Sequence, residues 1–124
     1  MEIKKKWGAI TKAQLFNMSK GNGCTLLKNV DEGARFKCAA ACIMTDNKGL
    51  DIETGREKTK DILHIVTTDG AIYTTESPTV IGTFTDACTF MEDHELEFTL
   101  FRAKSKNGRQ YMDLRLEGLE AMEG

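Results

Sequence analysis

The chain of 124 residues lacks any apolar run of the roughly 18 to 20 residues that are needed to cross a bilayer. Its N-terminal lysines are not followed by a long apolar stretch, so the sequence predicts no signal peptide. We therefore expect a cytoplasmic protein with no membrane partner. The length suits a single domain, because it allows a buried core but not two domains of ordinary size.

Cysteine is present in a pattern that does not indicate a metal site. None of the four cysteines belongs to a C-x-x-C pair, and without a signal peptide we expect them to be reduced. Cys38 and Cys42 share one face of a predicted strand, but they would lie roughly 13 Å apart, too far to bind one zinc ion. We favour the alternative that both are small core residues.

Catalytic motifs are also missing. The sequence has no P-loop, no H-E-x-x-H and no Rossmann glycine pattern, and neither His64 nor His94 lies in a motif that suggests a catalytic triad. We therefore expect no enzymatic activity and no cofactor.

Charge is segregated along the chain, although the net charge is only −2. Residues 1–30 carry six lysines and one acidic residue, a net charge of +5. Residues 101–115 carry five cations and one acidic residue (+4), whereas residues 76–97 carry six acidic residues and no Lys or Arg (−6). A fold that brings the two basic ends together would present a basic face to nucleic acid, although segregated charge also occurs on proteins that bind none.

Alternation of apolar and polar residues predicts five strands. In order they are Arg35–Thr45, Lys58–Thr67, Ala71–Thr75, a strand through Leu96, Phe98 and Leu100, and a strand through Met112, Leu114 and Leu116. The inward face of the first strand is predicted to hold Phe36, Cys38, Ala40, Cys42 and Met44. The polar segment Asp46–Glu57 predicts a long loop, and Asp69-Gly70 predicts a tight turn.

One helix and one further hairpin complete the predicted fold. Ser77-Pro78 favours a helix start, because Ser caps a free N–H and Pro needs none, and the helix is expected to end near Met91. Segments Ala9–Asn17 and Cys24–Lys28 flank two glycines and suggest an extra N-terminal hairpin. The predicted organisation is a flexible basic arm (1–8), one domain (9–117) and a loose tail (118–124).

This order of elements is typical of an OB-fold, a five-stranded Greek-key barrel, here with one helix between strands 3 and 4. Such barrels bind oligonucleotides between two loops, which in this chain would be Asp46–Glu57 and Lys104–Gly108. The second loop is basic and turns at Asn107-Gly108. Cations there could neutralise phosphates, and aromatic residues nearby could stack on bases at ~1 to 3 kcal/mol each. The alternative is a merely solubilising turn.

The candidate nucleic-acid-binding residues are cations and aromatic residues that the strand registers place on exposed faces. They are Lys4, Lys5, Lys6, Trp7, Arg35, Lys37, Lys58, Lys60, Tyr73, Phe101, Arg102, Lys104, Lys106, Arg109, Tyr111 and Arg115. Trp7 is expected to close over the strand on its arm, or alternatively to close the bottom of the barrel. Tyr111 shares a predicted face with Arg115, and Lys58, Lys60 and His64 share another.

Four motifs occur in order over about residues 13–116: Leu15-Phe16-Asn17 with glycines 21 and 23, the segment Leu27 to Gly33, the segment Asp69 to Tyr73, and the turn Ser105 to Gly108. In these the chain resembles the small single-stranded DNA-binding proteins of tailed phages with protein-primed replication and of bacterial mobile elements. The resemblance implies an OB-like fold, sequence-nonspecific coating and protection of single-stranded DNA during replication, and tyrosines that contribute to binding. Tyr73 best matches a family tyrosine.

A second function remains open on the same barrel. The chain could be a protein-interaction module, such as an inhibitor of a host DNA-processing enzyme, because the acidic stretch Glu76–Glu97 could face a basic partner. RNA would use the same surface as single-stranded DNA. Further partners to consider are other copies of the chain on DNA and replication proteins.

We expect purified protein to contain no stoichiometric zinc by elemental analysis, because the cysteines are predicted to be core residues. One zinc ion per chain would contradict this interpretation.

Overall fold

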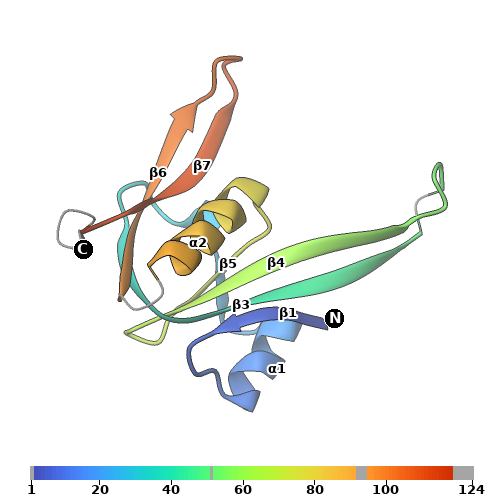
Figure 1. Ribbon diagram of the computed structural model, residues 1–124, viewed down its shortest axis with the longest axis horizontal. Helices are drawn as coiled ribbons and strands as arrows, with labels where there is room; N and C mark the ends of the chain where they lie inside the picture. The colour runs from blue at the N-terminus through green and yellow to red at the C-terminus, as the bar shows by residue number, and fades with distance from the viewer. Residues whose placement is uncertain (1, 51, 92–94, 119–124) are drawn as a thin grey trace.

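The computed structural model describes residues 2–50, 52–91 and 95–118. Its helices and strands follow one another along the chain as shown in Figure 1. They are β1 (Glu2–Trp7), α1 (Lys12–Lys20), β2 (Cys24–Leu26), the 3-10 helix η1 (Leu27–Asn29), β3 (Arg35–Leu50), β4 (Glu57–Thr67), β5 (Ile72–Thr75), α2 (Pro78–Phe90), β6 (Leu96–Lys104) and β7 (Gln110–Leu116). No helix in this described part of the chain is both long and apolar enough to span a membrane.

The seven strands form one mixed sheet in the order β2-β5-β4-β3-β6-β7, with β1 added beside β3. The sheet curls through 213° into a half-barrel, and α2 lies inside the curl (Figure 1). Among the described strands, β2 pairs with β5 in parallel and the other pairings are antiparallel. The half-barrel is therefore open between the two ends of this path, β2 and β7.

Strand β3 buries side chains on both faces beyond Cys38, and a β-bulge determines which residues face which core. Its pairing with β4 steps from Cys38 opposite Thr67 to Ala40 opposite Val66, which leaves Ala39 as the extra residue. Residues that face the larger core, under α2, are Phe36 before the bulge and Ala41 and Ile43 after it. Residues that face a second core, under α1, are Ala40, Cys42 and Met44. The prediction of one shared inward face was therefore wrong beyond the bulge.

The N-terminal residues are not a free arm. Glu2–Trp7 is strand β1, paired antiparallel with β3, and the Trp7 ring packs edge-on against Phe84 of α2 with 5.4 Å between ring centroids. Burying the large indole surface favours this position over a mobile one. Trp7 thus closes the larger core, which was the alternative expectation.

The prediction of an extra N-terminal hairpin was also wrong, because its first segment forms helix α1. Thr11 and Gln14 form a capping box: Thr11 Oγ1 accepts from the Gln14 N–H (3.1 Å), and Gln14 Oε1 accepts from the Thr11 N–H (2.9 Å). The second half is β2, which pairs with β5 and so enters the main sheet.

The remaining elements largely confirm the predictions. Strands β4 to β7 lie where they were expected, and α2 begins after Ser77, whose Oγ accepts from the Val80 N–H at 3.3 Å. The predicted loop Asp46–Glu57 is shorter, because β3 and β4 continue as a long hairpin whose last pair is Leu50 and Glu57. Most of the predicted tail, residues 119–124, lies outside the described residues.

Glycine at position 8 permits the close approach of β1 to the bulge. Gly8 has φ +72°, and a Cβ built there would lie 2.7 Å from the Ala39 carbonyl oxygen. Gly21, with the same φ of +72°, has open space around its Cβ position. Glycine is therefore required at position 8 both by the left-handed backbone and by the lack of space for a Cβ atom. At position 21 it is required by the left-handed backbone alone.

We expect Gly21→Ala to lower the free energy of unfolding by about 1 kcal/mol, the cost of a left-handed backbone. Gly8→Ala should lower it by about 3 kcal/mol, because its methyl group must also displace β3. Urea unfolding of both variants measures the difference. Equal losses would contradict the close contact between β1 and β3.

Candidate nucleic-acid interface

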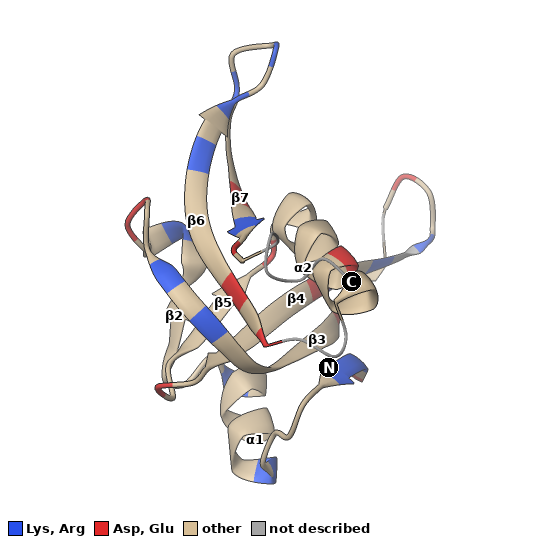
Figure 2. Cartoon of the chain, turned by 60° about the vertical axis from the view of Figure 1, so that its left-hand side comes forward, with Lys and Arg blue, Asp and Glu red and all other residues tan. Residues whose placement is uncertain are grey.

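The β6–β7 hairpin projects beyond α2 and carries cations at its tip (Figures 1 and 2). Its turn is closed by the Ser105 N–H, which donates to the Arg109 carbonyl at 2.8 Å, and Gly108 adopts φ +78°, as the turn prediction required. Lys104, Lys106 and Arg109 are exposed and form no ion pair with any described residue. Positive charge at the tip is therefore available to an anionic ligand.

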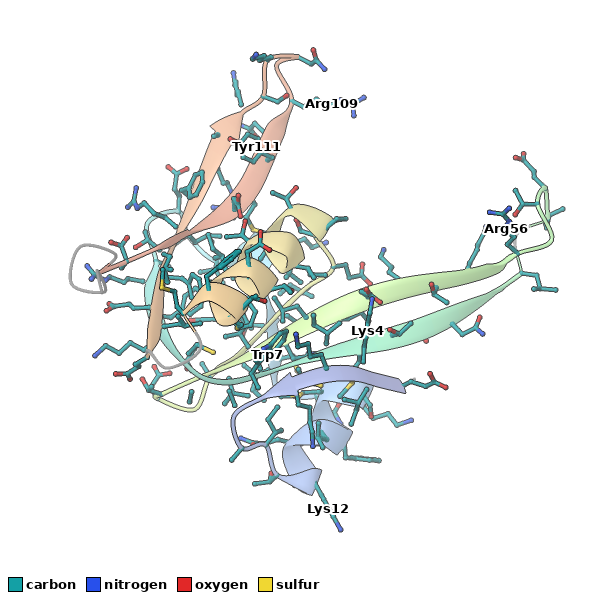
Figure 3. All side chains as sticks on the ribbon, in the orientation of Figure 1. Lys4, Trp7, Lys12, Arg56, Arg109 and Tyr111 are labelled. Atoms are coloured by element: carbon teal, nitrogen blue, oxygen red, sulfur yellow. The ribbon has the colours of Figure 1, made fainter. Side chains whose placement is uncertain are left out.

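An aromatic ring stands just below this tip. Tyr111 lies opposite Ala103 and is 39% exposed, and Phe101, opposite Asp113, is half-buried on the same face. Arg115 occupies that face too, which confirms the predicted grouping with Tyr111. Tyr111 is thus positioned for stacking beside the cations of the turn (Figure 3).

Arg102 has a structural role that the sequence did not indicate. Its guanidinium Nη2 donates to the carbonyls of Lys28 (3.0 Å) and Val30 (2.9 Å), and its backbone N–H donates to Glu32 Oε1 (2.9 Å). These bonds join η1 and the residues after it to β6, next to the backbone bonds that Gly33 and Ala34 form with Leu100. Arg102 therefore holds the hairpin in place instead of extending from it.

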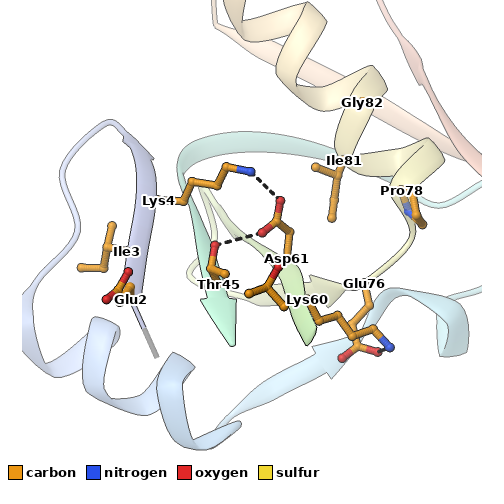
Figure 4. A pocket seen from close by; sticks show the side chains of 11 residues that line it. Glu2, Ile3, Lys4, Thr45, Lys60, Asp61, Glu76, Pro78, Ile81 and Gly82 are labelled. Carbon is orange, nitrogen blue, oxygen red and sulfur yellow. Dashed lines mark hydrogen bonds and ion pairs between the residues drawn. The ribbon is translucent and has the colours of Figure 1, made fainter. Parts of the chain in front are cut away.

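Four other predicted cations are engaged in ion pairs. Figure 4 shows Lys4 donating to Asp61 (2.7 Å), which also accepts from the Thr45 hydroxyl (2.9 Å), at a pocket between β1, the β3–β4 hairpin and α2. The bond from Lys4 holds the pKa of Asp61 below its usual value. The other pairs are Lys60 with Glu76 (2.8 Å), Arg35 with Glu97, and Arg115 with Glu117 (3.1 Å).

The remaining predicted cations are exposed on three strands and form no ion pair within the described residues: Lys5, Lys6, Lys37 and Lys58. The Lys5 ammonium lies 5.1 Å from the centre of the Trp7 ring, a cation–π contact. These lysines are spread over the sheet, so the tip of the β6–β7 hairpin is where free cations are grouped.

Tyr73 does not stand exposed as predicted. It lies opposite Ile65, on the face that turns toward the larger core, and its ring packs edge-on against Phe36 with 5.2 Å between centroids. The ring is half-buried and retains an edge on a small pocket that Arg35 and Lys37 also line.

His64 shares its face of β4 with Lys58 and Lys60 by alternation, but it is buried where that face turns toward α1 and the second core. Its Nδ1 shares a hydrogen bond of 2.8 Å with Thr74 Oγ1, and its Nε2 has no partner among the described residues. Burial lowers the pKa of His64 to about 4, so the ring is neutral at physiological pH.

The cysteines are free thiols divided between the two cores. Burial raises the pKa of Cys38 to about 12 and that of Cys88 to about 11, so both remain protonated and unreactive at neutral pH. Within the described residues, no group of three or more His, Cys, Asp or Glu side chains could hold a metal ion.

No protein-family model, no curated protein and no solved structure matches this chain. The function is therefore inferred from the chain's own residues and their geometry.

The buried His64 should make stability depend on pH. The pKa is about 4 in the folded protein and 6.5 in an unfolded chain, so the unfolded state binds more protons between these values. Folding stability should therefore fall as the pH is lowered from 6.5 to 4, by about 3 kcal/mol for this group. The free energy of unfolding of wild type and His64→Gln, compared at pH 7.5 and pH 4, isolates the effect. If the unfolding free energies of the two proteins differ by the same amount at both pH values, this effect of His64 is contradicted.

Proposed function

We propose that this protein binds single-stranded DNA with little sequence preference, on an OB-like fold. Strands β3, β4 and β5 are consecutive and β6 returns beside β3, which is a Greek-key arrangement. Helix α2 follows the third of these strands, and β7 is the fifth, as in an OB-fold. This order supports the OB-like interpretation of the half-barrel.

The observation that carries the function is the β6–β7 hairpin, which displays three unpaired cations and an exposed tyrosine. In an OB-fold this hairpin and the one between β3 and β4 would border the bound strand. Counterion release would favour the binding of phosphates at Lys104, Lys106 and Arg109, and a base could stack on Tyr111. Neither contact depends on the nucleotide sequence of the DNA. Coating and protection of DNA during replication of a phage or mobile element is the role that we propose for this mode of binding, as the resemblance in the four sequence motifs would imply.

A protein-interaction module is the second candidate, and α2 favours it. The helix contains no Lys or Arg, and Phe90 at its end is 76% exposed. A surface without cations that exposes Phe90 and one carboxylate, Asp86, suits a protein partner better than it suits DNA. If the protein does not bind oligonucleotides even at low salt, this candidate is favoured.

We expect the triple variant Lys104→Ala, Lys106→Ala and Arg109→Ala to bind oligo-dT more weakly. Its plot of log affinity against log salt should be flatter by about 2, since each phosphate contact to a single strand contributes about 0.7. Fluorescence anisotropy at several salt concentrations measures both quantities.

The matched control exchanges the same cations, as Lys104→Arg, Lys106→Arg and Arg109→Lys. Because the charge is kept, its salt dependence should equal that of the wild type. A triple alanine variant with an unchanged slope would remove the hairpin from the interface.

A further inference from the structure

Helix α1 presents an exposed aromatic ring between two cations. Phe16 is 61% exposed, and Lys12 and Lys20 lie four residues before and after it, along one side of the helix. The Lys20 ammonium lies 6.0 Å from the centre of the Phe16 ring. The opposite side of α1 packs into the second core through Leu15 and Met18. Phe16 therefore contributes little to the fold and is free to meet a ligand.

Along the sequence on either side of this ring, all charged residues are lysines. From Ile3 to Val30 the sequence has six lysines and no acidic residue, and Figure 3 shows Lys12 pointing away from the rest of the molecule. A ligand that matches cations on both sides of an apolar ring is a polyanion with flat aromatic groups. Single-stranded nucleic acid has this chemistry.

A groove connects α1 with the β6–β7 hairpin across the open side of the half-barrel. Its volume is about 430 Å³, and it runs over β4 and β5 between the end of α1 (Ser19, Gly21), β2 and η1 (Leu26, Lys28) and β7 (Met112). Glu76 also lines the groove, and its carboxylate is paired with Lys60 at 2.8 Å. The carbonyl of Lys28 is held by Arg102, while its side chain is exposed. Met112 faces this groove from the side of β7 opposite to Tyr111, so an extended strand that leaves the hairpin enters the groove by crossing the outer edge of β7. Along the groove it passes Lys28 and reaches the end of α1, where Lys20 and Phe16 lie on the exposed side of the helix.

We propose that α1 is a second contact surface for the same strand, with a base stacked on Phe16 and phosphates at Lys12 and Lys20. This inference rests on the proposed function and lengthens its footprint from the hairpin to the far end of the groove. A chain bound at both surfaces covers the open side of the half-barrel.

The test compares Phe16→Ala with Phe90→Ala, its matched control. Both remove an exposed phenylalanine, but α2 has no cation next to Phe90. With oligo-dT of about 20 nucleotides, Phe16→Ala should lose about tenfold in affinity and Phe90→Ala should lose none. The double variant Lys12→Ala and Lys20→Ala should flatten the salt dependence by about 1.

A direct readout is photo-crosslinking of a 4-thiothymidine oligonucleotide, followed by mass spectrometry of the peptide that contains Phe16. A crosslink there, together with the loss in Phe16→Ala, supports the inference. If wild type binds DNA and depends on the hairpin cations, but Phe16→Ala equals Phe90→Ala and no crosslink reaches α1, this inference alone is overturned. If wild type binds no oligonucleotide at low salt, the proposed function fails as well.

Discussion

The β-bulge at Ala39 is the constraint on which the rest of the structure depends. Along one edge β3 pairs with β4, and along the other it pairs first with β6 and then with β1. The extra residue reverses the alternation and so determines which apolar side chains of β3 face each core. Without it, Ala40, Cys42 and Met44 would turn toward the larger core, and Ala41 and Ile43 would turn toward α1.

The cations fall into two groups: some bind other residues of the chain, and others have no such partner among the described residues. The guanidinium groups of Arg35, Arg102 and Arg115 each bind another part of the chain, in keeping with the preference of this planar group for fixed hydrogen-bond geometry. Arg109 and several lysines are left at the hairpin tip and on α1. A net negative protein can thus present local positive surfaces, because its acidic residues lie mostly on other elements or are already paired.

The sequence was most informative where local signals agree with the tertiary fold. Strands β4 to β7, the Ser77 cap and the Asn107-Gly108 turn were predicted because alternation, capping and turn residues all pointed the same way. The bulge could not be predicted, since the run of small residues from Cys38 to Cys42 does not distinguish one register from another. Tyr73 and Trp7 were misplaced because the pairings that carry them to the core are long-range.

The site was only partly visible in the sequence for a related reason. The cations of the hairpin follow from its turn, but the grouping on α1 depends on the helix. In a strand, Lys12 and Lys20 would lie about 26 Å apart, whereas in a helix they lie about 12 Å apart. The capping box at Thr11 and Gln14 was the signal that could have revealed it.

The pairing of β3 also has a consequence for synthesis of the protein. Its first residues, Arg35–Cys38, pair with β6, which follows only after β4, β5 and α2, so in a nascent chain this part of β3 has one edge unpaired for much of translation. Contacts between residues so distant in sequence form slowly. This segment carries Phe36 and Cys38 on one face, and a strand edge that is unpaired beside apolar side chains readily pairs with another chain. Aggregation during synthesis is therefore expected to begin at β3, and a chain that ends before β6 should be insoluble.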